Sequence, residues 1–284
     1  MSLSRVDNQL AALLRGCALL VAAIVLLILL FLVKESWPVL RHVALTRFVT
    51  DAAWHPVEGL YKLTPMLSAT LYSTLGAVLL AAPLGIASAL FSRYYAPPLL
   101  AGCYRRLIEL LAGIPSVVYG FWGLTTLAPI IGRLHSPGVS LLTGILILTL
   151  MILPTVALTV DAALAAVPVA YVHGAAALGL SRWGLISGVI LPAARSGIAA
   201  GIMLAAGRAI GETMAVLMVA GNVVQQPQSI FDSVRTLTAN IALEMAYATG
   251  GHRAALFVSG LALMAMVLVL VGTAEVVSKE RQHV

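Results

Sequence analysis

Six long apolar runs alternate with shorter polar segments along the 284 residues of the chain. A run of about 20 apolar residues is long enough to cross the hydrocarbon core of a bilayer as a helix. We predict spanning helices at about residues 16–33, 63–91, 107–131, 141–160, 197–220 and 254–277. The polar segments contain no long repeat and no low-complexity linker. The pattern therefore predicts one all-α transmembrane domain over residues 1–284.

The first apolar run is interpreted as an uncleaved helix that enters from the cytoplasm. It is followed by Lys34-Glu-Ser-Trp-Pro38, which offers no small-x-small cleavage site for a secretory signal. Residues 34–62 are predicted to form a polar extracytoplasmic segment. Six helices place both termini in the cytoplasm, and the basic loop 92–106 (Arg93, Arg105, Arg106) is expected on the same side, because short cytoplasmic loops collect Arg and Lys.

Composition supports an integral membrane protein. Apolar residues make up 61% of the chain and charged residues 10%, whereas soluble domains have about 25% charged residues. The net charge of +6 is not gathered in a basic patch outside the loops, so we expect no nucleic-acid partner. Cys17 and Cys103 are isolated and predict neither a disulfide nor a metal site. The histidines His135, His173 and His252 fall in expected loops and are predicted to be solvated.

The polar break at residues 171–192 is too amphipathic to cross a bilayer and too apolar to be a free loop. Ala175 and Ala176 favour a helix, which Gly179 is expected to end in a left-handed cap. Ser181 is then expected to cap a second short helix, from Arg182 to about residue 189. Pro192 is expected to limit its continuation. We therefore predict two short helices at the membrane surface within a cytoplasmic loop at about residues 161–196.

Two charged residues lie inside the fifth apolar run, in the segment Gly207-Arg-Ala-Ile-Gly-Glu-Thr213. Arg208 is expected about 16 Å from a helix start at Gly197, near the middle of a hydrocarbon core about 30 Å thick. Glu212 would follow one turn later on the same face. The two side chains either form a structural pair or present a positive site to an anion. We favour the second interpretation, because charges at this depth usually serve function.

Glu212 also suggests a hypothesis about selectivity. A carboxylate accepts hydrogen bonds from a protonated oxyanion such as hydrogenphosphate and repels a fully deprotonated one such as sulfate. Small residues surround the pair, and close helix packing explains them as well as an open path does. Glu109, near the cytoplasmic end of the third helix, is expected to pair with Arg105 or Arg106 or to reach water.

Several energy-coupling and catalytic motifs are missing from the sequence. There is no Gly-x-x-x-x-Gly-Lys-Ser/Thr phosphate loop, no His-Glu-x-x-His, no Cys-x-x-Cys and no complete Gly-x-Ser-x-Gly. We therefore expect no catalytic activity and no cofactor in this chain. Energy must come from another subunit or from an ion gradient.

Four stretches together resemble permease subunits of phosphate ABC importers, and the PstC type more than the PstA type. Gly174-Ala-Ala, Gly179, nine residues, Val189 and Leu191-Pro192 resemble the Glu-Ala-Ala loop of ABC permeases, with Gly174 where the family has Glu. The others are Ser36-Trp37-Pro38, the segment Ile108–Gly123 with its Ile-Pro-Ser-Val-Val-Tyr-Gly, and Gly201–Val216.

The resemblance implies the six-helix type I importer fold in a bacterial inner membrane. It implies a second, PstA-type permease that shares the pathway, two ATPase subunits that use ATP, and an extracytoplasmic phosphate-binding protein. The expected ATPase-coupling residues are His173, Gly174, Ala175, Ala176, Gly179, Leu191 and Pro192. The expected pathway residues are Arg208, Glu212 and Thr213.

Three alternatives stay open. The first is an importer for another oxyanion, against which the Arg208 and Glu212 pair argues in the case of sulfate. The second is an ion-coupled secondary transporter, which needs ion ligands in broken helices and gives no reason for the 174–192 spacing. The third is a membrane-embedded enzyme, which needs a nucleophile and base or a metal set that Arg208 and Glu212 do not supply.

Overall fold

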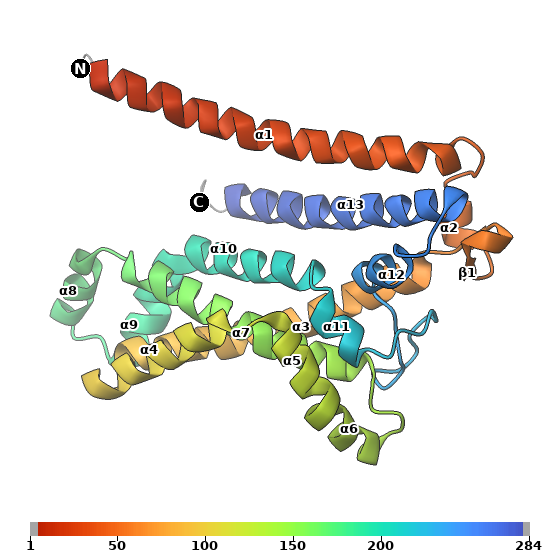
Figure 1. Ribbon diagram of the computed structural model, residues 1–284. Coiled ribbons are helices and arrows are strands. Elements are labelled where there is room, and N and C mark those ends of the chain that lie inside the picture. Colours follow the sequence, from red (N-terminus) through yellow and green to blue (C-terminus); the bar gives the residue numbers. More distant parts are fainter. Residues whose placement is uncertain (1–4, 281–284) are drawn as a thin grey trace. The chain divides into compact units, whose positions relative to one another are not determined.

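The computed structural model describes the backbone of residues 5–280 and the side chains of residues 7–273 (Figure 1). Six helices in this part are long and apolar enough to span a membrane. They are Asp7–Leu40, Thr64–Tyr95, Ser116–Leu134, Leu141–Ala165, Arg182–Ile210 and Gly250–Thr273. The number of spanning helices agrees with the sequence prediction. The chain forms two compact units, residues up to Lys62 with Glu244–Ala262, and Leu63–Leu243 with the residues from Leu263 onward.

The first unit contains α1 (Arg5–Leu40), α2 (Arg47–Thr50), a small antiparallel hairpin and the beginning of α13 (Gly250–Glu280). The hairpin pairs β1 (Trp54–His55) with β2 (Leu60–Tyr61) across the turn Pro56–Glu58. Phe31 of α1 packs edge-on against Phe257 of α13, with ring centroids 5.6 Å apart. α1 extends beyond the predicted 16–33 at both ends, because an apolar run marks only the part suited to lipid.

A buried carboxylate ties this unit together. Oε2 of Glu244 accepts a hydrogen bond from the Trp54 indole at 3.0 Å and lies 2.8 Å from Nε2 of His252. The prediction of a solvated His252 is wrong, because His252 lies in the first turn of α13 and is 8% exposed. Glu244, which joins His252 to Trp54, lies 190 residues from Trp54 in the sequence. This contact therefore could not be predicted from local sequence.

The core of the second unit is centred on α7 (Leu141–Ala165), which packs against α3 (Thr64–Leu90) and α10 (Leu191–Ile210). Leu148, Met151 and Ile152 of α7 are almost fully buried. α3 approaches α7 closely at a glycine: a Cβ placed on Gly85 would lie 2.7 Å from Cγ1 of Val156. Small residues thus allow the helix backbones to pack tightly. α3 continues as the π-helical turn Phe91–Tyr95.

The third predicted helix, 107–131, is broken. The structure has α4 (Pro98–Gly113), α5 (Ser116–Trp122), the π-helical turn Gly123–Leu127 and α6 (Ala128–Leu134). The break falls at Ile114, whose extended backbone (ψ 128°) follows from the proline after it. Residues 98–106, predicted as loop, are helical, because Pro98 suits a first helical turn.

The remaining boundaries also differ. α7 runs to Ala165, so Asp161 lies inside this helix and does not open the loop. After α8 (Val169–Ala177) and α9 (Arg182–Leu185), the π-helical turn Ile186–Ile190 leads directly into α10. α11 (Met214–Val219) and α12 (Leu237–Glu244) follow, and α13 extends through Glu280. The predicted tail after residue 278 is therefore helical as far as Glu280, and residues 281–284 lie outside the described part.

Candidate functional site

The fifth spanning helix ends inside the predicted segment 197–220. α10 stops at Ile210, residues 211–213 are not helical, and α11 begins at Met214. The hydroxyl of Thr238 donates a hydrogen bond of 2.8 Å to the backbone carbonyl of Glu212. Helix ends leave carbonyl groups without partners, and this distant threonine supplies one. The prediction of one continuous helix is therefore wrong at this point, and the candidate charges lie at a backbone break.

Arg208 lies in the last turn of α10, and its side chain is exposed. Nη1 lies 3.5 Å from Oγ1 of Thr155. Thr155 is about 21 Å along the axis of α7 from its first residue, near the middle of that helix. Arg208 therefore lies level with the middle of α7, and its side chain is exposed in this chain.

The α4–α5 break is connected to the break at residues 211–213. A Cβ on Gly120 of α5 would lie 2.8 Å from Cα of Ala215, in the first turn of α11. Tyr119 lies beside Gly120 in the same helix. Its hydroxyl donates a hydrogen bond of 2.8 Å to the carbonyl of Leu111, in the last turn of α4. Thr155 and Tyr119 were not among the predicted site residues. The sequence did contain a hint of Tyr119, because Pro115 predicts a helix break shortly before this tyrosine.

Glu212 is used locally as a helix cap. Its Oε1 accepts a hydrogen bond of 3.1 Å from the backbone N–H of Ala215, in the first turn of α11. A carboxylate at this position satisfies a free N–H group and complements the helix dipole. Within residues 7–273, Glu212 and Arg208 form no ion pair. The predicted arrangement of Glu212 one helical turn after Arg208 is therefore wrong: Arg208 lies in the last turn of α10 and Glu212 lies within the non-helical residues 211–213.

Thr213 completes the break. It is partly exposed, and its hydroxyl donates a hydrogen bond of 3.3 Å to the carbonyl of Gly211. The neighbouring glycines divide into two groups. Gly197 and Gly201 face Ala163 and Thr159 of α7, and a side chain there would clash. A Cβ on Gly207 would meet no atom within 4 Å. The first group serves close packing, and Gly207 leaves open space beside Arg208.

The first part of the polar break at residues 171–192 has the predicted local structure, whereas the predicted second short helix runs on into α10. α8 ends in a left-handed Gly179 (φ +70°). The N–H of Leu180 donates to the carbonyl of Ala175 at 3.2 Å, and that of Gly179 to the carbonyl of Ala176 at 3.0 Å. This pair of hydrogen bonds is a Schellman cap. The hydroxyl of Ser181 then accepts the N–H of Gly184 at 3.1 Å and caps α9.

The predicted coupling residues differ in exposure. Ala175 is buried, whereas His173, Gly174, Ala176 and Gly179 are exposed. Leu191 is half-buried against the core and Pro192 is exposed. Pro192 does not end the second helix, because it lies in the first turn of α10, where its missing N–H costs nothing. Large apolar side chains are also exposed in this loop, namely Val169, Tyr171, Leu178, Leu180 and Trp183.

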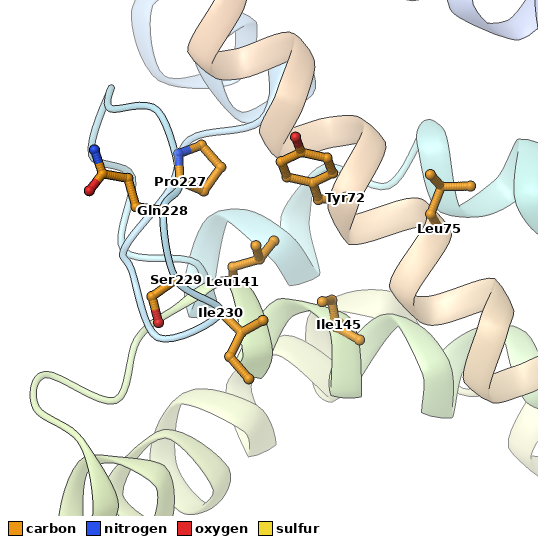
Figure 2. Close-up of a pocket in the computed structure, with 8 residues that line it drawn as sticks. All are labelled: Tyr72, Leu75, Leu141, Ile145, Pro227, Gln228, Ser229 and Ile230. Carbon is orange, nitrogen blue, oxygen red and sulfur yellow. The ribbon is translucent and has the colours of Figure 1, made fainter.

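A pocket of about 300 Å³ is present whose lining does not include Arg208. Tyr72 and Leu75 of α3, Leu141 and Ile145 of α7 and residues 227–230 line it (Figure 2). None of these lining side chains is charged, so the pocket does not provide an anion site. The loop beside it is ordered by Asp232, whose pKa is lowered because its carboxylate accepts the backbone N–H groups of Ser229 and Gln228.

Comparison with curated proteins gives relatives over most of the chain. A probable ABC transporter permease protein, YqgH, of Bacillus subtilis is 39% identical over 259 residues, covering 88% of this chain and 84% of that protein. The phosphate transport system permease protein PstC of Mesorhizobium japonicum is 33% identical over 278 residues, covering 90% and 84%. PstC of Haemophilus influenzae is 33% identical over 277 residues, covering 89% and 88%.

Comparison with solved structures gives the same fold. A chain of a bacterial alginate ABC transporter, solved with its alginate-bound periplasmic protein, superposes with a TM-score of 0.68 at 16% identity, covering 96% of both chains. A chain of the MetNI methionine ABC transporter in an inward-facing conformation gives 0.60 at 17% identity, covering 80% of this chain and 96% of that one. The predicted type I importer fold is confirmed.

The matching family model covers residues 81–281, which include both candidate regions, the loop with its Schellman cap and the break beside Arg208. This match extends over more than half of the chain and agrees with the relatives and the fold. The chain therefore belongs to the family of binding-protein-dependent transport system inner membrane components.

Proposed function

We propose that this chain is a membrane permease subunit of an ATP-driven importer of inorganic phosphate. The relatives named as phosphate permeases support the substrate. The observation that carries the proposal is the exposed Arg208, level with the middle of α7. A charged side chain at the centre of a bilayer costs about 2.5–3.5 kcal/mol on insertion scales. The surface around Arg208 is therefore covered by something polar, which we take to be a water-filled path for an anion.

The other side of that path comes from a second, homologous permease subunit of the PstA type. Gly207 and Arg208 face open space in this chain alone, which leaves room for the partner and for the anion. Glu212 and Thr213 line the same break, where Oε2 of Glu212 is available to accept a hydrogen bond from hydrogenphosphate. An extracytoplasmic binding protein delivers the phosphate.

The loop 169–192 receives the ATPase. Its small exposed residues, His173, Gly174 and Ala176, permit close approach, and its exposed large apolar residues supply contact area. Two ATPase subunits bind and hydrolyse ATP, and this chain carries no catalytic group and no cofactor. Both termini and this loop lie in the cytoplasm. ATP binding moves the loop and opens the path outward, and hydrolysis resets it.

The test is phosphate uptake into proteoliposomes that contain this chain, its partner permease and the ATPase. Phosphate-loaded binding protein is added on the extracytoplasmic side of the complex. Arg208→Gln is compared with Arg133→Gln, which removes an exposed arginine from the last turn of α6. We expect Arg208→Gln to reduce uptake at least about 100-fold, as for removal of a preorganised charge, while assembly and ATP hydrolysis persist. Arg133→Gln is expected to transport like the wild type.

Survival of uptake in Arg208→Gln would place the path elsewhere. Uptake by the wild type without any ATPase would contradict the importer and support the secondary transporter. A second candidate substrate, another oxyanion, is tested by competition in the same assay. Sulfate is expected not to compete, because the Glu212 carboxylate repels an anion that has no proton to donate.

A further inference from the structure

One carboxylate joins three helices near the loop 169–192. Oδ1 of Asp161, in α7, accepts a hydrogen bond of 2.8 Å from Nε of Arg93, in the π-helical turn that ends α3. Its other oxygen, Oδ2, lies 3.4 Å from Nη1 of Arg105, in α4. Each oxygen thus holds a different helix. We call Arg93, Asp161 and Arg105 the Asp161 clamp.

The clamp is well placed to hold its geometry. The Asp161 side chain is 15% exposed and that of Arg93 is 28% exposed, so water competes for the carboxylate only in part. Nε of Arg105 is occupied by Oε1 of Glu109 at 3.1 Å, one turn along α4. This confirms the predicted pairing of Glu109 with Arg105. Two negative and two positive side chains therefore alternate, and each guanidinium has a carboxylate partner.

α4 has few other attachments. Ile108 is the buried residue among its sixteen, and Leu99 and Leu110 are 89% and 69% exposed. Pro97 precedes the helix, Pro98 is its first residue, and the Ile114 break follows it, so both of its ends are separated from the neighbouring helices. Beside the clamp, the hydroxyls of Ser88 (α3) and Tyr104 (α4) lie 2.9 Å apart. The position of α4 against α7 therefore depends on polar contacts at the clamp.

α4 contacts both of the regions that transport must connect. Arg105, in the middle of α4, pairs with Asp161, which lies four residues before the end of α7. α8 begins at Val169, directly after the three-residue connection 166–168.

In the last turn of α4, the carbonyl of Leu111 accepts a hydrogen bond from the hydroxyl of Tyr119. The next residue of α5, Gly120, packs against Ala215 in the first turn of α11, directly after the break at residues 211–213. α4 therefore connects the region beside the loop 169–192 with the region beside the break at residues 211–213.

We infer that Asp161 is a positioning residue for transport, which carries displacement of α8 through the end of α7 to α4 and so to the break beside Arg208. The inference rests on the proposed docking of the ATPase on α8. Without the carboxylate, α8 and α7 still move, but α4 does not follow. ATP hydrolysis then continues, but the break at residues 211–213 moves less. Hydrolysis and phosphate transport become uncoupled.

The test measures phosphate transported per ATP hydrolysed by the full complex in proteoliposomes. Asp161→Asn removes the charge with little change in shape, and Arg105→Gln removes one arm of the clamp. Arg105 is 57% exposed, so the second variant is expected to fold even if the first does not. We expect both to lower the ratio at least about fivefold, the lower range of coupling effects between sites, with hydrolysis retained. Arg106→Gln, which removes an exposed charge of α4 outside the clamp, is the control and is expected to keep the wild-type ratio.

A fourth variant separates this inference from the proposed docking. Ala176→Trp places a bulky side chain on the exposed face of α8 and is expected to weaken ATPase binding, measured by copurification. If Ala176→Trp weakens binding while Asp161→Asn and Arg105→Gln keep the wild-type ratio, the docking stands and the clamp has no role. Equal losses in Arg106→Gln would also overturn the inference, because they would show that loss of any charge on α4 has this effect. Unchanged binding in Ala176→Trp would contradict the docking itself.

Discussion

The loop at Gly179 and the break at Gly211 have the same outline, a helix, a glycine and a second short helix, but different causes. At Gly179 the hydrogen bonds that end α8 and start α9 join residues within five positions of each other. At Gly211 the backbone is not left-handed (φ −81°), and the carbonyl of Glu212 is satisfied by Thr238, 26 residues away. The loop is locally encoded, whereas the break depends on tertiary contacts.

This difference explains what could be predicted from the sequence. The Schellman cap and the Ser181 cap follow from residue types at fixed offsets, and both predictions are confirmed. The end of α10 at Ile210 has only a weak local signal, because a single Gly211 costs about 1 kcal/mol within a helix and is tolerated there. An apolar run therefore predicted one helix where the structure has two.

The same reasoning applies to the rest of the fold. The six spanning segments follow from apolar length alone. The break at Ile114 had a local signal in Pro115 that the apolar run masked. The partner of Arg208, Thr155, comes from another helix, α7, so this contact appears only once the helices are packed.

Substitution of Gly179 is expected to have the largest effect of those that test the difference between the loop and the break. Gly179→Ala forces a Cβ into a left-handed backbone, which costs about 1–2 kcal/mol. Because the cap is local, we expect the distortion to stay in the loop and to reduce ATPase copurification while the fold survives. The control is Gly188→Ala, since a Cβ there meets no atom within 4 Å and the backbone is helical. Equal loss of copurification in the control would show that the cap is not responsible.

The next largest effect is expected at Glu212. Two substitutions separate its role as the cap of α11 from its role in anion selectivity. Glu212→Ala removes the α11 cap and is expected to cost about 1 kcal/mol of stability. Glu212→Gln keeps an oxygen acceptor for the Ala215 N–H and removes only the charge. We therefore expect Glu212→Gln to retain wild-type thermal stability in detergent but to let sulfate compete with phosphate uptake. Continued rejection of sulfate by this variant would sink the selectivity hypothesis.

Thr238→Val tests whether the break is a tertiary feature. The substitution removes the hydroxyl that donates to the Glu212 carbonyl, and loss of one such hydrogen bond costs about 0.5–1.5 kcal/mol. We expect faster hydrogen exchange at residues 211–214 and no change at residues 175–184. Thr125→Val is the control, because the Thr125 hydroxyl donates only to carbonyls in its own turn of helix. Exchange that stays slow at the break would show that local sequence suffices to form it.

The smallest effect is expected at Gly174, where the family motif has Glu. A Cβ there meets no atom within 4 Å, so Gly174→Glu fits without strain and raises the helix propensity of α8 by about 0.5–1 kcal/mol. We expect a small gain in thermal stability and unchanged or slightly stronger ATPase binding, measured by copurification at several salt concentrations. Weaker binding would indicate that the docking surface requires a small residue at this position.

The most direct test of the central claim asks whether the surface at Arg208 faces water or lipid. Gly207→Cys is introduced with Cys17 and Cys103 replaced by Ser, in the assembled complex, and labelled with a membrane-impermeant sulfonated thiosulfonate. Leu79→Cys, on an exposed apolar surface of α3, is the control and is expected to react only with a lipid-soluble reagent. We predict that Gly207→Cys reacts with the impermeant reagent and that phosphate with its binding protein slows the reaction. Reaction only with the lipid-soluble reagent, unaffected by phosphate, would contradict a water-filled anion path beside Arg208.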